Sequence, residues 1–172
     1  MTDIYINRKN PVFTALYWCA LAINKKDPRE FCQYIHLDTE CLLTATDGKR
    51  MHQVQDFSME GMEPGAYEVV KQTKTMLVLA HSTDVPGLPV HPRRLWPSDP
   101  VMHDAGTYKT DHTITAIIRA LPDGYFPTIS QLAQVLSIPM HRYAVMDAPM
   151  STVYLEGENT RALITLTKVR AS

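Results

Sequence analysis

The chain has 172 residues, of which 45% are apolar and 20% charged, and these proportions predict one globular domain and exclude wholesale disorder. Its seventeen basic and eighteen acidic side chains give a formal net charge of −1, so any affinity for nucleic acid must come from the placement of charges. No apolar run reaches the roughly 20 residues of a membrane-spanning helix, and the three cysteines lack CxxC spacing. We therefore expect a soluble, cytoplasmic protein with reduced thiols and no membrane contact.

The N-terminal half predicts one helix followed by strands. Asn10-Pro11 is a typical helix start, because asparagine accepts hydrogen bonds from free amides and proline fits the first turn. Apolar residues recur at helical spacing after it, and the helix should end near Asp27-Pro28. Partly alternating residues around polar turns then predict strands over 31–37, from Leu42 to the Asp47-Gly48 turn, and over 52–57, 67–70 and 75–80.

The segment 84–107 differs from the rest in composition, because it is rich in prolines, which prevent regular strand pairing. These are Pro86, Pro89, Pro92, Pro97 and Pro100. Leu95 and Trp96 are its isolated apolar anchors, so packing is favoured over disorder. We expect a proline-rich insertion or a long ordered loop of functional or interface character.

The C-terminal part predicts a second set of elements. β-branched and apolar residues favour a strand over 114–121, although a short helix is an alternative. Ile129, Leu132, Val135 and Leu136 then share one helical face within 128–136, and Pro139 ends that helix. Three strands are expected at the end, over 142–146, 152–155 and 162–169, with a hairpin turn over 157–159.

The same order of elements occurs twice along the chain. A strand, a helix and further strands are expected from Ile4 to Gln55, and again from Ile114 to Thr167. The repeat lies in element order and not in residue identity. It predicts an α+β fold of duplicated βαβββ halves in which two helices pack on antiparallel sheets.

One stretch of sequence resembles a known family. Residues 42–51, Leu-Leu-Thr-Ala-Thr-Asp-Gly-Lys-Arg-Met, resemble a stretch of the bacterial DNA polymerase III β sliding clamp, where Ala-Thr-Asp-Gly is followed by a basic or histidine residue, arginine and an apolar residue. Residues 122–127 are similar to the clamp's Asp-Gly-x-Phe-Pro segment, and the closing strands to the end of a clamp domain. The resemblance implies a single clamp-like domain over 1–172 and a non-enzymatic DNA clamp in replication or repair.

The resemblance also implies a protein-binding site. Clamps capture short apolar peptides of replication and repair proteins beside the Ala-Thr-Asp-Gly turn. By position, one wall of such a cleft would be formed by Thr46, Gly48, Lys49, Arg50 and Met51. Exposed backbone amides and the stem of Arg50 would give an apolar surface that still forms hydrogen bonds. The alternative is that Asp47-Gly48 is only a hairpin turn.

Double-stranded DNA is the second partner that the resemblance implies. In clamps the helices line a channel and present cations to phosphates. The candidates here are Arg8, Lys9, Lys25, Lys26 and Arg29. No lysine or arginine lies in 128–138, so half of this lining is missing, and an ordinary solvated face is the alternative. Clamp subunits resemble three such domains in tandem, so a ring made from this chain requires a homo-oligomer.

No constellation for catalysis, cofactor binding or metal binding is recognised in the sequence. There is no Gly-x-Ser-x-Gly elbow, Walker loop or HExxH motif, so no cofactor and no metal is expected. The best local cluster is His103, Asp104, Asp111 and His112, which would serve a small metal-dependent hydrolase if its side chains converged. A structural or regulatory homo-oligomer without DNA binding is the third hypothesis.

Overall fold

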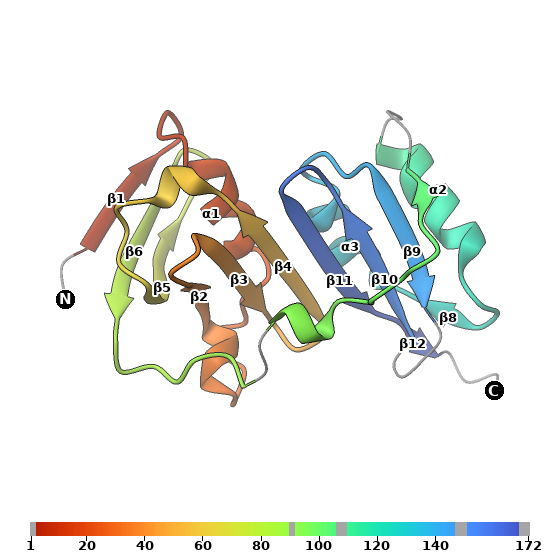
Figure 1. The fold of residues 1–172 in the computed structure, drawn as a ribbon, viewed down its shortest axis with the longest axis horizontal. Coiled ribbons are helices and arrows are strands. Elements are labelled where there is room, and N and C mark those ends of the chain that lie inside the picture. Colours follow the sequence, from red (N-terminus) through yellow and green to blue (C-terminus); the bar gives the residue numbers. More distant parts are fainter. Residues whose placement is uncertain (1–2, 90–91, 106–109, 147–150, 169–172) are drawn as a thin grey trace. The chain divides into compact units, whose positions relative to one another are not determined.

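The structure, a computed structural model, describes residues 3–89, 92–105, 110–146 and 151–168. It divides into two compact units, unit 1 over Met1–Trp96 and unit 2 over Pro97–Ser172 (Figure 1). The boundary falls inside the proline-rich segment 84–107. The union of both units into the single clamp-like domain expected over 1–172 stays a prediction. No helix of the described residues is long and apolar enough to span a membrane.

Unit 1 is built on antiparallel strands in the order β1-β6-β5-β2-β3-β4. Their bounds are β1 Asp3–Asn7, β2 Tyr34–Leu37, β3 Leu42–Thr46, β4 Arg50–Gln55, β5 Gly65–Gln72 and β6 Met76–Ser82. Each strand predicted in this half is present, although the one predicted over 31–37 begins only at Tyr34. Strands β5 and β6 form a hairpin with a register shift between Val69 and Lys71. That hairpin carries β1, which pairs with β6, at its outer side.

Helix α1, Phe13–Ala20, packs against this sheet (red in Figure 1). It is shorter than the predicted helix at both ends. Asn10 accepts the Val12 amide through Oδ1 at 3.1 Å, so the first turn is organised by asparagine as expected, but regular helix starts only at Phe13. Beyond Ala20 the chain leaves the helix, and the Asn24 amide donates to Cys32 O at 2.8 Å. Nearly every residue of α1 is buried, which explains why it carries no charge.

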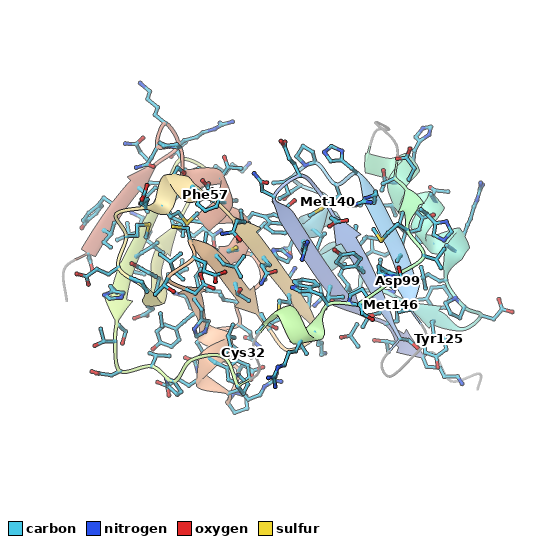
Figure 2. All side chains as sticks on the ribbon, in the orientation of Figure 1. Cys32, Phe57, Asp99, Tyr125, Met140 and Met146 are labelled. Atoms are coloured by element: carbon cyan, nitrogen blue, oxygen red, sulfur yellow. The ribbon has the colours of Figure 1, made fainter. Side chains whose placement is uncertain are left out.

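Two short 3-10 helices complete unit 1. Helix η1, Glu30–Gln33, precedes β2 and buries Cys32 completely, whereas η2, Phe57–Met59, follows β4. In η2 the Asp56 side chain accepts the Ser58 amide, Met59 is buried and Phe57 is 72% exposed (Figure 2). The fully buried large side chains of unit 1 come from α1, η2 and the strands: Leu16, Trp18, Ile35, Leu43, Met59, Tyr67, Leu77 and Leu79.

Unit 2 contains a four-stranded antiparallel arrangement in the order β11-β10-β9-β7, and a separate pair β12-β8. The strands are β7 His103–Asp104, β8 Tyr125–Phe126, β9 Arg142–Met146, β10 Thr152–Glu156, β11 Thr160–Thr165 and β12 Thr167–Lys168. Its helices are α2, Thr110–Ala120, and α3, Ile129–Val135. Ile117, Leu132, Leu155 and Ile164 are its largest fully buried side chains.

The strand predicted over 114–121 is wrong, because residues 114–120 belong to α2, and the short helix given as the alternative is what the structure has. Thr113 and Ile117, four residues apart, are the buried positions, while Thr115 and Arg119 are exposed. This spacing is that of a helix with one packed face. The β-branched residues suggested a strand, but packing of that single face overrides their local preference.

The predicted fold class is confirmed. The structure is α+β with helices on antiparallel sheets, and the order βαβββ occurs as β1-α1-β2-β3-β4 and again as β8-α3-β9-β10-β11. The leading strand of the second copy is therefore β8 and not residues 114–121. Within the described residues of 84–107, only the 3-10 helix η3, Pro92–Leu95, and the two residues of β7 are regular.

Candidate functional site

The reversal over 46–51 joins β3 to β4. Gly48 has φ +79°, a conformation that glycine adopts without steric cost. Asp47 organises the turn, because its Oδ1 accepts the amides of Lys49 and Arg50 at 2.9 Å each. Thr46 Oγ1 accepts the Gly48 amide at 2.9 Å and donates to Arg50 O at 2.7 Å. The sequence therefore specifies this turn through the side chains on either side of its glycine.

These hydrogen bonds occupy the backbone amides that were expected to bind a peptide. The amides of Gly48, Lys49 and Arg50 were expected to be exposed for hydrogen bonding to a peptide, but each already has a side-chain acceptor within the turn. Gly48 and Lys49 are exposed as residues, and Thr46 is half-buried. What the turn offers to a partner is thus side-chain surface and carbonyl oxygens.

Arg50 lies inside the unit and is only 9% exposed. Its Nε donates to Asp47 Oδ2 at 3.1 Å, and its Nη2 donates to Leu21 O at the end of α1. Burial lowers the pKa of Arg50, and the neighbouring Asp47 carboxylate opposes that shift. A cation at a helix C-terminus is favoured by the helix dipole. Arg50 therefore fastens the turn to α1 and does not present the open stem that was expected.

The strand that follows continues this anchoring. Met51 is buried, and His52 is fully buried with its ring stacked on Trp18, the centroids 4.1 Å apart. His52 Nδ1 donates to Trp18 O, since a carbonyl can only accept, at 2.8 Å. Burial lowers the pKa of His52 to about 3, so the ring is neutral. His52 is not among the predicted site residues, and the signal that could have pointed to it is its place two residues after Arg50, on the same strand face.

Arg29, predicted to contact DNA, lies at the reversal. A Cβ on Gly48 would stand 2.0 Å from Arg29 Nη2, and this nitrogen donates to Asp47 O at 3.3 Å. Arg29 also forms a two-pronged ion pair with Asp27, with both nitrogen–oxygen distances 2.8 Å. This pair lowers the pKa of Asp27 to about 2 and raises that of Arg29. Gly48 is thus favoured by its positive φ, whereas the half-exposed end of the Arg29 side chain beside it can move.

The other predicted DNA contacts lie on loops. Arg8 and Lys9 are exposed in the turn after β1, and Lys25 and Lys26 are exposed beyond the end of α1. Lys25 Nζ donates to Val69 O of β5. Neither α1 nor α3 carries a lysine or arginine, and Arg119 is the single cation of α2. The idea of a basic helix face is therefore not supported, and DNA contact by these side chains stays a prediction.

The candidate metal cluster does not assemble in the residues that the structure describes. His103 and Asp104 are exposed on β7, His112 is exposed on α2, and the Asp111 side chain lies outside the described residues. The His103 ring packs against Tyr143 with centroids 5.4 Å apart. Among the described side chains, no group of three or more His, Cys, Asp or Glu could hold a metal ion. The metal-dependent hydrolase is not favoured.

The arrangement of strands and helices is that of the bacterial DNA polymerase sliding clamps. The sequence itself matches no protein-family model and no curated protein. The structure is similar to the sliding clamp of Bacillus subtilis with TM-score 0.55 and 12% identity, over 98% of this chain and 65% of that one. It is similar to DNA polymerase III subunit beta of Borrelia burgdorferi with TM-score 0.56 and 10% identity, over 99% and 64%.

A third similar structure is the Helicobacter pylori beta clamp bound to a DNA ligase peptide, with TM-score 0.55 and 9% identity, over 97% of this chain and 66% of that one. At these identities the likeness shows the fold. The chain spans less than two thirds of the Bacillus subtilis and Borrelia burgdorferi clamps.

Proposed function

We propose that the chain is a non-enzymatic, sliding-clamp-like module that binds proteins of DNA replication or repair. The observation that carries the proposal is a clamp fold over 98% of the chain with an ordered reversal over 46–51. The ligase peptide bound to the Helicobacter pylori clamp supports a short peptide as the partner. The five residues proposed for its capture are Thr46, Gly48, Lys49, Arg50 and Met51.

The geometry divides these five residues by role. Gly48 and Lys49 are exposed and are available to touch a peptide, with the half-exposed Arg29 side chain beside them. Arg50 and Met51 are buried, so they support the turn from beneath. Arg29 is already paired with Asp27, whereas Lys49 makes no ion pair with any described residue. We infer that a bound peptide places an acidic side chain or carboxylate near Lys49.

DNA association forms the second part of the proposal. We propose that it involves a homo-oligomer, since the resemblance implies a ring and this chain matches 65% of the Bacillus subtilis clamp. The cations that support it are Arg8, Lys9, Lys25, Lys26 and Arg29, which lie on loops and are less densely placed than a basic helix face. We expect weak, salt-sensitive binding to phosphates without sequence preference.

Peptide capture is tested with Lys49→Glu. The labelled probe is the DNA ligase peptide of the kind bound by the Helicobacter pylori clamp, and the readout is fluorescence anisotropy. Reversing this exposed charge should weaken binding up to about fivefold, since an exposed ion pair contributes up to about 1 kcal/mol. Lys74→Glu, an equally exposed lysine between β5 and β6, is the matched control and should bind as the unaltered chain does. Absence of binding by the unaltered chain, or equal loss in both variants, would contradict the proposed site.

A further inference from the structure

Unit 1 contains a surface groove that the proposed peptide site does not use. Its volume is about 340 Å³, within the range of small-molecule sites. It lies over strands β2, β3, β5 and β6, and the first residues of the proline-rich segment, including Val85 and Leu88, form its outer wall. We call it the unit 1 groove. None of the five residues of the proposed peptide site lines it.

The floor of the unit 1 groove is one row of residues in register across four strands. Thr44 of β3 pairs with His36 of β2, His36 with Ala66 of β5, and Ala66 with Ser82 of β6. Residues paired in this way lie on the same face, with strands about 4.8 Å apart. All four residues are at least nine-tenths buried. Since alanine is the smallest of them, it leaves space between the imidazole and the serine hydroxyl.

The polar atoms of this row are not fully used by the protein. His36 Nε2 donates to Phe31 O at 2.8 Å, because the carbonyl can only accept. Burial lowers the pKa of His36, so the ring is neutral and Nδ1 is left as a hydrogen-bond acceptor. Within the described part of the chain, neither His36 Nδ1 nor the Ser82 hydroxyl has a hydrogen-bond partner, and both keep contact with solvent. Because both atoms touch solvent, a ligand that enters the groove can reach them, Nδ1 as an acceptor and the hydroxyl as a donor or an acceptor.

The Thr44 hydroxyl adds a third group. It accepts a hydrogen bond from Gln53 Nε2 at 3.3 Å, and its own proton is free to be donated. The row thus offers one acceptor, His36 Nδ1, and two hydroxyls that can donate. Around it the walls are largely apolar, with Leu42, Val85 and Leu88 among them.

The charge of the residues that line the groove disfavours anionic ligands. Among the described residues that line it, Asp38 alone carries a formal charge at neutral pH, and that charge is negative. Its Oδ1 is occupied by the amides of Glu40 and Leu42, at 2.8 and 2.9 Å. A phosphate or carboxylate ligand would enter without a cation to meet it and against this carboxylate.

We propose that the unit 1 groove binds an uncharged, mainly apolar small molecule with one hydrogen-bond donor that pairs with His36 and one acceptor that pairs with Ser82. A ring N–H can donate to His36 Nδ1 on β2, and a primary amide carbonyl can accept from the Ser82 hydroxyl two strands away on β6. The flat apolar part of the molecule then lies over Ala66, against Val85 and Leu88. This site is independent of peptide capture at the reversal.

The first test compares two probes on the unaltered chain. Indole-3-carboxamide and indole-3-carboxylate have nearly the same shape and differ in charge, so titration of each is followed by two-dimensional NMR of ¹⁵N-labelled protein. The carboxamide should shift the backbone amides of Ala66, Ser82 and Leu88 in a saturable way, whereas the carboxylate should bind at least tenfold more weakly. Equal binding of both probes, no binding of the carboxamide, or shifts confined to other parts of the chain would overturn the proposal.

The second test uses variants that the structure predicts to fold. A Cβ built on Gly87, at the wall of the groove, or on Gly61, away from it, meets no atom within 4 Å. Gly87→Trp should therefore obstruct the groove and abolish the carboxamide shifts, while the matched control Gly61→Trp should leave them intact. Ser82→Ala, which removes one donor without filling space, should weaken binding about fivefold. The proposal is wrong if Gly87→Trp binds the probe as Gly61→Trp does, or if Ser82→Ala binds with unchanged affinity.

Discussion

At the scale of single residues, Arg50 shows how burial changes the meaning of a motif. Its guanidinium links Asp47 to the end of α1 and is nearly excluded from solvent. We therefore expect Arg50→Glu to lower the free energy of unfolding by about 3 to 5 kcal/mol, because it leaves Asp47 facing a second carboxylate at a buried site. Urea denaturation measures this loss. Lys49→Glu, one residue earlier but exposed, should stay within about 0.5 kcal/mol of the unaltered chain. Similar small losses in both variants would mean that Arg50 is not anchored in solution.

His52 belongs to the same scale and predicts a pH dependence. Its pKa is about 3 in the folded chain against 6.5 for a free histidine, so the unfolded state binds the proton more readily between these values. The stabilisation is complete above pH 6.5 and is lost as the pH falls towards 3, by at most about 1.4 kcal/mol per pH unit. In urea denaturation from pH 7 to 4, His52→Asn, which keeps a donor for Trp18 O, should give a shallower decline. An unchanged slope would assign the acid sensitivity to other groups.

At the scale of elements, the orientation of α2 determines which of its two neighbouring isoleucines is buried. Ile117 is fully buried and Ile118 is only half-buried, as expected for one packed helical face. Ile117→Ala should cost about 2 to 5 kcal/mol of unfolding free energy through lost contacts and the cavity left behind. Ile118→Ala is the chemically matched control and should cost about 1 kcal/mol or less. Equal costs, measured by thermal or urea denaturation, would contradict the orientation of α2.

The reversal over 46–51 is the element whose local structure the sequence predicts best. Asp47-Gly48 signals a turn by local chemistry alone, and the structure has that turn with glycine at positive φ. The burial of the neighbouring Arg50 could not be predicted from local sequence. Whether Arg50 points outwards or beneath the turn depends on Leu21, which lies 29 residues earlier in the chain.

At the scale of the whole molecule, the DNA proposal depends on self-association. We expect light scattering to show an oligomer and DNA affinity to fall steeply as salt rises, because released counterions provide most of such binding. The double variant Lys9→Gln/Lys26→Gln should weaken DNA binding. It should also reduce the slope of the logarithm of the binding constant against the logarithm of the salt concentration by about 1 for each lost phosphate contact, or about 2 for each chain that contacts DNA. Lys71→Gln/Lys74→Gln, also exposed, is the control. An oligomer without salt-dependent DNA binding would instead favour the structural or regulatory hypothesis.

The sequence by itself determined the elements whose signals are local. These include the strands on either side of Asp47-Gly48, the helix α3 before Pro139, the closing strands and the α+β class. Each is specified by periodicity or by a residue with restricted backbone geometry. Only the tertiary structure decided the rest. Four features depend on contacts between residues that are distant in the sequence, and such packing outweighs local preference. They are the helical state of residues 110–120, the inward position of Arg50, the position of Arg29 beside Gly48 and the polar row beneath the unit 1 groove.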